Sequence, residues 1–253
     1  MNEDLPRTPS FRLEGRRALV TGAGRGIGLA AAAALAAAGA AVTLVGRHAE
    51  EIEAGARTIG PQACAVTLDV CDLAAVKAFF AAQPAFHILV NNAGINLPMP
   101  MWQVDETDYD TVLDLNVKAA FFVAQACVRQ MIKEGVAGCL LHMGSQMGHV
   151  GGVNRSLYCA SKWALEGMNK AFALDLARYG IRSNTIAPTF IETPMTKPFF
   201  EDQAFRASVL DKIKLGRIGH VEDLMGAVVF LASDAAALIT GTSLVVDGGW
   251  TAD

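Results

Sequence analysis

Two kinds of hydrophobic pattern alternate along most of the chain. Short apolar runs bounded by turn residues predict seven β-strands, at Arg17–Thr21, Ala41–Gly46, Ala63–Leu68, His87–Asn91, Gly138–Met143, Ser183–Ala187 and Ser243–Asp247. Apolar residues at helical spacing predict helices between them, at Gly26–Ala38, Glu50–Ile59, Leu73–Ala82, Asp108–Lys133, Leu157–Arg178 and Val221–Ala232. Because strands joined through helices need crossover connections, the pattern predicts a doubly wound α/β fold, with a parallel sheet and helices on both faces.

The absence of a linker within this pattern indicates the domain organisation. No linker rich in proline, serine or charge divides the 253 residues, and 52% of them are hydrophobic. We therefore expect a single domain over residues 12–253 with a large core, preceded by an N-terminal extension over residues 1–11.

Charge and composition exclude several classes of protein. The formal net charge is −4, whereas a chain that neutralises nucleic-acid phosphates is basic. The apolar stretch Leu29–Val45 is mostly alanine and is shorter than the ~20 strongly apolar residues of a membrane span. Residues 1–10 lack the apolar stretch of a signal peptide. The five cysteines are odd in number and show no CxxC pair, so we expect buried free thiols in a reducing cytoplasm and no metal site.

A glycine-rich turn joins the first predicted strand to the first predicted helix. It reads Thr21-Gly22-Ala23-Gly24-Arg25-Gly26-Ile27-Gly28. Glycines allow the backbone to approach a pyrophosphate closely, and the free N–H groups of a helix N-terminus attract it. The turn therefore predicts a dinucleotide site, although its spacing is TGxxxGxG and not GxGxxG.

The end of the second predicted strand bears on which dinucleotide binds. A carboxylate there favours NAD, because it bonds the ribose hydroxyls, whereas a cation favours the extra phosphate of NADP. Gly46-Arg47 stands at this point with no acid, and Arg25 lies in the glycine turn. These arginines favour NADP(H), while NAD(H) stays open if both are solvated surface residues.

Three polar residues suggest acid/base chemistry on an alcohol or carbonyl. Tyr158 and Lys162 are one helical turn apart and share a face. An ammonium beside a phenol favours the phenolate, which lowers the tyrosine pKa. Such a tyrosine can exchange a proton with a substrate oxygen. Ser145 follows a predicted strand, where its hydroxyl can hold the same oxygen.

Taken together, these motifs resemble the short-chain dehydrogenase/reductase family in its common form of about this length. The resemblance runs from Arg12 to Asp253, and its motifs occur in the family's order. They are Thr21–Gly28, Asp69-Val70, Asn91-Asn92-Ala93-Gly94, Leu115-Asn116-Val117, Ser145, Tyr158-Cys159-Ala160-Ser161-Lys162, and Pro188 to Thr193. Thr189 departs from the Pro-Gly that usually follows the sixth strand. The resemblance implies a Rossmann fold and a hydride-transferring oxidoreductase that uses NAD(P).

The same resemblance assigns roles to individual residues. It makes Tyr158 the acid/base and Ser145 the substrate-orienting hydroxyl. Lys162 would lower the tyrosine pKa and bind the nicotinamide ribose, and Asn116 would hold a water that relays protons. The remaining cofactor contacts would come from Gly22, Arg25, Gly26, Ile27, Gly28, Arg47, Asp69, Val70, Asn92, Ala93, Gly94, Pro188, Ile191 and Thr193.

Substrate residues of this family lie after the serine, after the NNAG segment and after the sixth strand. The candidates are Asn96, Gln146, Met147, His149, Asn154, Arg155 and Glu192, with a substrate loop over about residues 190–215 that carries three phenylalanines and could close as a lid. Their polarity suits a sugar, sugar acid or polyol. The segment Leu44–Glu50 is similar to gluconate 5-dehydrogenase-like members. By resemblance, the last predicted strand and the two long helices form a homotetramer.

Two other interpretations remain at this point. One is an NAD(H)-dependent dehydrogenase of a less polar ketone or alcohol. The other is a relative that binds the nucleotide without catalysis, against which the intact Asn116, Ser145, Tyr158 and Lys162 argue. A lyase on the same fold is disfavoured because the chain keeps both the glycine turn and the lysine.

Overall fold

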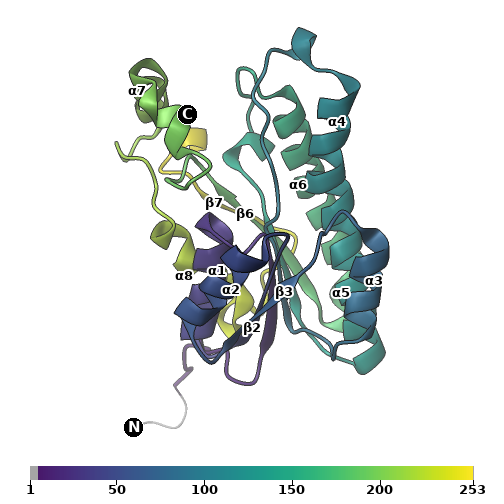
Figure 1. The fold of residues 1–253 in the computed structure, drawn as a ribbon. Coiled ribbons are helices and arrows are strands. Elements are labelled where there is room, and N and C mark those ends of the chain that lie inside the picture. The colour runs from purple at the N-terminus through teal and green to yellow at the C-terminus, as the bar shows by residue number, and fades with distance from the viewer. Residues whose placement is uncertain (1–4, 253) are drawn as a thin grey trace.

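A seven-stranded parallel sheet forms the centre of the molecule (Figure 1). The computed structural model describes residues 5–252. The strand order is β3-β2-β1-β4-β5-β6-β7, so the direction of winding reverses between β1 and β4. The strands are β1 (Arg17–Thr21), β2 (Ala41–Gly46), β3 (Ala63–Thr67), β4 (Ile88–Asn91), β5 (Cys139–Met143), β6 (Arg182–Pro188) and β7 (Ser243–Val246). The predicted fold class and all seven strands are confirmed, and each predicted strand limit lies within one residue of the observed one.

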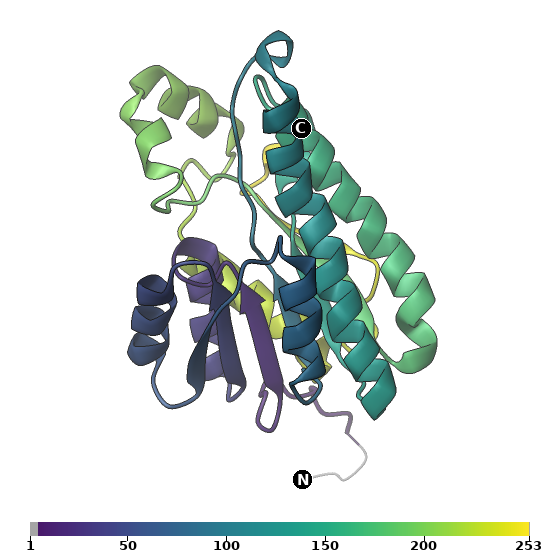
Figure 2. The ribbon, with the colours of Figure 1, turned by 45° about the vertical axis from the view of Figure 1, so that its right-hand side comes forward.

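Helices cover both faces of this sheet, as Figures 1 and 2 show. One face carries α1 (Gly26–Ala37), α2 (Ala49–Ile59) and α8 (Glu222–Ala232). The other carries α3 (Leu73–Ala81), α4 (Glu106–Leu113), α5 (Ala120–Glu134) and α6 (Ser156–Leu176). Residues 5–13 form neither helix nor strand, and residues 1–4 of the predicted extension lie outside the described part.

Successive residues of the central strands pack alternately into two separate cores, one on each face of the sheet. In β1, Ala18 and Val20 pack in the core under α1 and α8, while Leu19 packs in the core under α3 and α5. In β5, Leu141 and Leu140 divide between the two cores in the same way. Because successive side chains of a strand point to opposite faces, burial on both faces explains why these strands are continuous apolar runs.

The long helix predicted over Asp108–Lys133 is interrupted by a wider turn. Helices α4 and α5 are joined by a π-helical segment over Asp114–Ala119, which carries Asn116. The helix starts earlier than predicted because Asp105 and Asp108 form a reciprocal capping box at its first turn. Within residues 5–252, only the stretch 106–134 has the length and apolar composition of a membrane span. Its residues Val123, Cys127 and Met131 are buried in the core, and a core helix meets the same criteria.

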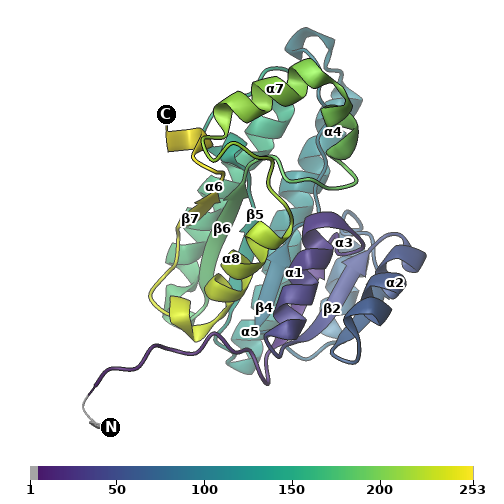
Figure 3. The same ribbon diagram turned by 90° about the vertical axis from the view of Figure 1, so that its left-hand side faces the viewer.

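The segment predicted as a substrate loop over residues 190–215 is largely helical. It contains a short 3-10 helix, η5 (Lys197–Glu201), and helix α7 (Gln203–Lys212). The side chain of Asp202 accepts hydrogen bonds from the backbone N–H groups of Ala204 and Phe205, which caps α7. Figure 3 shows α7 lying above the carboxyl ends of the strands. The loop prediction is therefore wrong in its structure, although the segment lies where a substrate segment is expected.

Candidate active site

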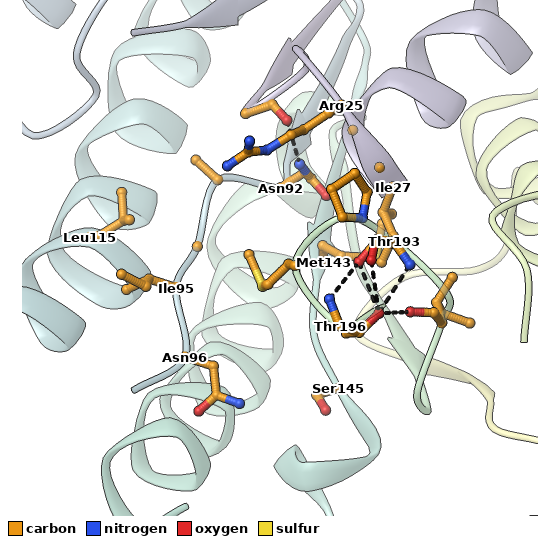
Figure 4. A pocket seen from close by; sticks show the side chains of 18 of the residues that line it. Arg25, Ile27, Asn92, Ile95, Asn96, Leu115, Met143, Ser145, Thr193 and Thr196 are labelled. Carbon is orange, nitrogen blue, oxygen red and sulfur yellow. Dashed lines mark hydrogen bonds between the residues drawn. The ribbon is translucent and has the colours of Figure 1, made fainter. Parts of the chain in front are cut away.

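A cavity of about 320 Å³ opens at the carboxyl ends of the central strands (Figure 4). Every predicted cofactor residue lines it: Gly22, Arg25, Gly26, Ile27, Gly28, Arg47, Asp69, Val70, Asn92, Ala93, Gly94, Tyr158, Lys162, Pro188, Ile191 and Thr193. In open parallel sheets this crevice, where the winding reverses, is the usual ligand site. The fold thus gathers segments from most of the chain into one cavity.

The glycine turn is held in place by the strand beside it. The amide of Asn92 donates to the carbonyl oxygens of Thr21 (2.9 Å) and Gly22 (3.1 Å). The buried hydroxyl of Thr21 accepts from the backbone N–H groups of Asn92 and Ala93. These bonds join the ends of β1 and β4, so the NNAG segment fixes the turn.

Two glycines of this turn cannot carry a side chain. Gly22 has φ +63°, and a Cβ atom there would lie 2.9 Å from the Cα of Ala93. A Cβ atom at Gly28 would lie 2.3 Å from the carbonyl oxygen of Gly22. The turn is thus a closely packed backbone cradle at the N-terminus of α1, and it fits the pyrophosphate of a dinucleotide.

The two arginines of the NADP argument differ in their surroundings. Arg25 forms an exposed ion pair with Glu51, with 3.4 Å between Nη1 and Oε1. Arg47 is exposed, and it makes no ion pair or side-chain hydrogen bond with the described residues. Sequence reasoning missed Glu51, which lies in the first turn of α2 and lines the cavity. Its carboxylate neutralises part of the charge at Arg25, so Arg47 is the freer cation.

Ser145, Tyr158 and Lys162 line the same cavity. Lys162 is buried, and its Nζ donates to the carbonyl oxygen of Met143 (2.8 Å), at the end of β5. The hydroxyl of Ser145 caps the 3-10 helix η3 (Gln146–Gly148) and donates to the side chain of Gln146 (2.8 Å). Strand β5 and helix α6 thus bring together three residues that the sequence predicted as neighbours.

The expected lowering of the Tyr158 pKa is wrong for this structure. Burial raises the pKa of Tyr158 to about 12, and the Ser145 side chain and the charge of Arg155 oppose that shift. The Nζ of Lys162 lies over the tyrosine ring, 5.4 Å from its centroid. Burial also lowers the pKa of Lys162 to about 8, against an opposing effect of Glu166. For both groups, the desolvation that comes with burial outweighs the opposing effects of their neighbours.

Asn116 lies behind the cavity wall, buried in the π-helical segment. Its amide exchanges two hydrogen bonds with the backbone of Ile95, each 2.8 Å long, and donates to the hydroxyl of Ser161 (3.0 Å). Ser161 in turn donates to the carbonyl oxygen of Tyr158. Asn116 therefore ties the segment after the NNAG motif to the helix that carries Tyr158 and Lys162.

The predicted substrate residues separate into two groups. Asn96, Gln146 and Met147 line the cavity, and Figure 4 shows Asn96 and Ser145 at the end opposite Arg25. His149, Asn154, Arg155 and Glu192 do not line it. His149 bonds Ser243 (2.9 Å), and exposed Glu192 lines a second cavity beside α7. Sequence spacing does not show which of these side chains line the cavity.

Several residues that line the cavity were not among the predicted cofactor or substrate contacts. Thr189, Thr196 and Phe199 come from the segment after β6. The Thr196 hydroxyl donates to the carbonyl oxygen of Ile191 and bonds Thr193 (3.1 Å), which holds this segment against the glycine turn. The hydroxyl of Thr189 and the amide oxygen of Asn96 are buried without a partner. Both residues line the cavity.

Comparisons with known proteins define the class. The family model described as enoyl-(acyl carrier protein) reductase matches residues 22–251. The chain belongs to the short-chain dehydrogenase/reductase family, as its motifs predicted, and it is an oxidoreductase.

Relatives similar to this chain are named as enzymes of erythrulose and gluconate. The chain is 38% identical to D-erythrulose reductase of Gallus gallus, over 96% of this chain and 98% of that protein. It is 39% identical to gluconate 5-dehydrogenase of Gluconobacter oxydans, over 95% and 96% of the two chains. The predicted similarity to gluconate 5-dehydrogenases is confirmed.

A solved structure shares the whole fold. Gluconate 5-dehydrogenase of Burkholderia cenocepacia, crystallised with NADP and tartrate, is 39% identical. It superposes with a TM-score of 0.92 over 96% of this chain and 98% of its own. The chain is therefore similar throughout to a dinucleotide-binding enzyme.

Proposed function

We propose that the chain interconverts a secondary alcohol and a ketone on a sugar, sugar acid or polyol, with NADP(H) as cofactor and Tyr158 as acid/base. The observation that carries the proposal is that Ser145, Tyr158 and Lys162 line the same cavity as the glycine turn and Arg47. Relatives named for erythrulose and gluconate, and a neighbour that binds NADP, support it.

The residues present fit a dinucleotide. Gly22 and Gly28 leave backbone room for the pyrophosphate, Arg47 would pair with the 2′-phosphate, and Asp69 would accept from the adenine amino group. Lys162, Ile191 and Thr193 would hold the nicotinamide end. When bound, the nicotinamide supplies or accepts the hydride.

The residues of the chain handle the proton and the substrate oxygen. With its raised pKa, Tyr158 is a neutral phenol at working pH and can donate a proton to the substrate oxygen during reduction. Ser145 would hold that oxygen by a hydrogen bond, and the ammonium of Lys162 would favour negative charge on it. Asn116 would hold the segment after the NNAG motif against α6 around this point.

The first test is nucleotide binding and turnover by the purified protein. We expect NADPH to raise the melting temperature more than NADH does. With NADP⁺, gluconate or a polyol should produce absorbance at 340 nm. A larger shift with NADH would contradict the choice of cofactor and leave the chemistry standing. No shift with either nucleotide would contradict the enzymatic proposal.

Arg47→Asp tests the choice of cofactor. The change puts a carboxylate where the 2′-phosphate would lie, so we expect KM for NADPH to rise about 10- to 100-fold while KM for NADH changes little. Glu51→Gln is the matched control, because it frees Arg25 and should slightly strengthen NADPH binding. Equal losses for both nucleotides would count against an arginine-bound 2′-phosphate. A carboxylate at Glu51 is also the feature that favours NAD(H), the second candidate.

The pH dependence follows from the two shifted groups. Oxidation needs deprotonated Tyr158, whose pKa is raised to about 12, so its rate should climb with pH. Reduction uses neutral Tyr158 and charged Lys162, whose pKa is lowered to about 8, so its rate should fall above that pH. We expect kcat/KM for reduction to peak at lower pH than for oxidation. Superimposable profiles would contradict these roles.

We also infer a cytoplasmic homotetramer. Strand β7 is at the edge of the sheet, and Val245 on it is exposed. Trp163 and Leu174 are exposed on α6, and such apolar residues favour contact with another copy. All five cysteines are free thiols, in keeping with a reducing compartment. The expectation that they are all buried is wrong, because Cys64 and Cys71 are exposed. Light scattering of the purified protein measures the mass directly.

A further inference from the structure

Arg155 is a buried cation with no counter-ion. Its relative exposure is 7%, and it stands at the N-terminus of α6, one turn before Tyr158. Within residues 5–252, no carboxylate lies within ion-pair distance of its guanidinium. A buried charge without a partner is costly, so proteins rarely keep one unless something compensates it.

One edge of this guanidinium is unused. Its Nη1 donates to the carbonyl oxygen of Asn154 (3.2 Å), which also accepts from the backbone N–H of Met99. Its Nε is buried without a partner, and no hydrogen bond engages Nη2 within the described part of the chain. These two nitrogens form one side of the arginine fork, which matches the two oxygens of a carboxylate.

The surroundings place Arg155 beside the substrate end of the cavity, next to residues that line it. The guanidinium lies over the ring of Phe199, 5.7 Å from its centroid, and Phe199 lines the cavity. A Cβ atom at Gly152 would lie 3.0 Å from Met147, which lines the cavity, and 3.2 Å from the Cγ of Arg155. Arg155 thus stands directly behind the wall formed by Met147 and Phe199. Stacking on a ring uses the face of a guanidinium and leaves its edge free to donate.

Arg155 also lies close in sequence to the proposed acid/base, Tyr158. Arg155 directly precedes the first turn of α6, three positions before Tyr158, and its charge acts on the Tyr158 phenol. Burial lowers the pKa of Arg155, opposed by the phenol of Tyr158 and the thiol of Cys159. An anion paired with the guanidinium would compensate for this burial.

We propose that Arg155 binds a carboxylate of the substrate beside Phe199, so that the enzyme selects hydroxy or keto acids over neutral sugars and polyols. This inference rests on the proposed function and narrows its substrate class. The hydroxyl of Thr189 and the amide of Asn96, both with unpaired buried atoms, would bond hydroxyl groups of the same substrate. Arg155 then selects the acid end of the molecule.

The test compares two substrates with the same carbon skeleton. D-Gluconate and D-sorbitol both have six carbons and differ at one end, which is a carboxylate in gluconate and a hydroxymethyl group in sorbitol. With NADP⁺, wild-type kcat/KM should be at least about tenfold higher for gluconate. Arg155→Gln should raise KM for gluconate about 10- to 100-fold, the usual effect of losing a charged hydrogen bond, and change KM for sorbitol less than about twofold.

Two variants control for charge and folding. Arg57→Gln makes the same chemical change at an exposed arginine of α2 and should leave both KM values unchanged. Arg155→Lys keeps the charge and stem but loses the fork, so it should restore only part of gluconate binding. If Arg155→Gln does not fold, the KM values of Arg155→Lys for gluconate and sorbitol test the proposal instead. A similar rise in KM for both substrates would overturn the proposal. It would indicate that Arg155 only holds Phe199 in place and does not bind the carboxylate.

Direct binding separates this proposal from the proposed function. If neither probe is turned over, gluconate and tartrate are titrated calorimetrically into wild type and Arg155→Gln in the presence of NADP⁺. Binding that is lost in Arg155→Gln supports the carboxylate site even without turnover. Absence of carboxylate binding to the wild type overturns it. Failure of NADPH to bind, measured separately, counts against the proposed function alone.

Discussion

Tyr158→Phe is expected to lower kcat about 10³- to 10⁴-fold in both directions, because it removes the hydroxyl that we propose as the acid/base. The ring, which packs against Lys162, is retained. The fold and the glycine turn do not depend on the lost oxygen. We therefore expect NADPH to give the same thermal shift as in the wild type, while steady-state assays at 340 nm find almost no turnover.

The comparison with Ser145→Ala sharpens this result. Ser145 would hold the same oxygen but does not carry the transferred proton, so its loss should cost less, about 10²-fold. If Tyr158→Phe kept more than a tenth of the wild-type kcat, another group would have to be the acid. If it lost the NADPH shift as well, the effect would be structural and would say nothing about proton transfer.

Gly28→Ala is expected to remove nucleotide binding and to lower the free energy of unfolding by about 3 kcal/mol. The new Cβ atom would lie 2.3 Å from the carbonyl oxygen of Gly22 and 2.5 Å from the amide nitrogen of Asn92. Backbone and a hydrogen-bonded amide cannot move aside without opening the link between β1 and β4. Urea unfolding and NADPH thermal shifts measure the two effects.

Gly226→Ala is the matched control for this substitution. Gly226 is an exposed residue of α8, and a Cβ atom there meets nothing within 4 Å. Alanine should stabilise this helix by about 0.5–1 kcal/mol, because it restricts the unfolded chain more than glycine does. If Gly28→Ala kept the nucleotide affinity of the wild type, the glycine turn would not be the pyrophosphate site.

The sheet was predictable because each strand is buried on both faces. Runs such as Ala18–Val20 in β1 are apolar without alternation, and the helices between them leave only parallel pairing. The π-helical turn at Asp114–Ala119 was not predictable, since a single wide turn leaves the apolar spacing of α4 and α5 almost unchanged. Helix α7 was missed because, of its residues, only Val209 is buried.

The site residues were predictable where backbone geometry alone fixes their position. Glycines that cannot bear a Cβ atom, and side chains at the ends of strands, occupy the expected cavity. Contacts formed by folding were not visible in the sequence. Glu51 reaches Arg25 only because α2 packs beside α1, and His149 turns toward Ser243 and away from the cavity. The free edge of Arg155 likewise depends on neighbours that spacing does not identify.

The pairing of β1 with β4 also bears on the order in which the chain assembles. Residue 18 lies beside residue 88, whereas each of the other strand pairs joins strands that are consecutive in the sequence. Closing a longer loop costs more entropy and slows folding. Among the strand pairs of the sheet, this one spans the longest stretch of chain. The nucleotide cradle, which the hydrogen bonds from Asn92 hold to the end of β1, therefore forms only when two parts of the chain far apart in sequence have come together.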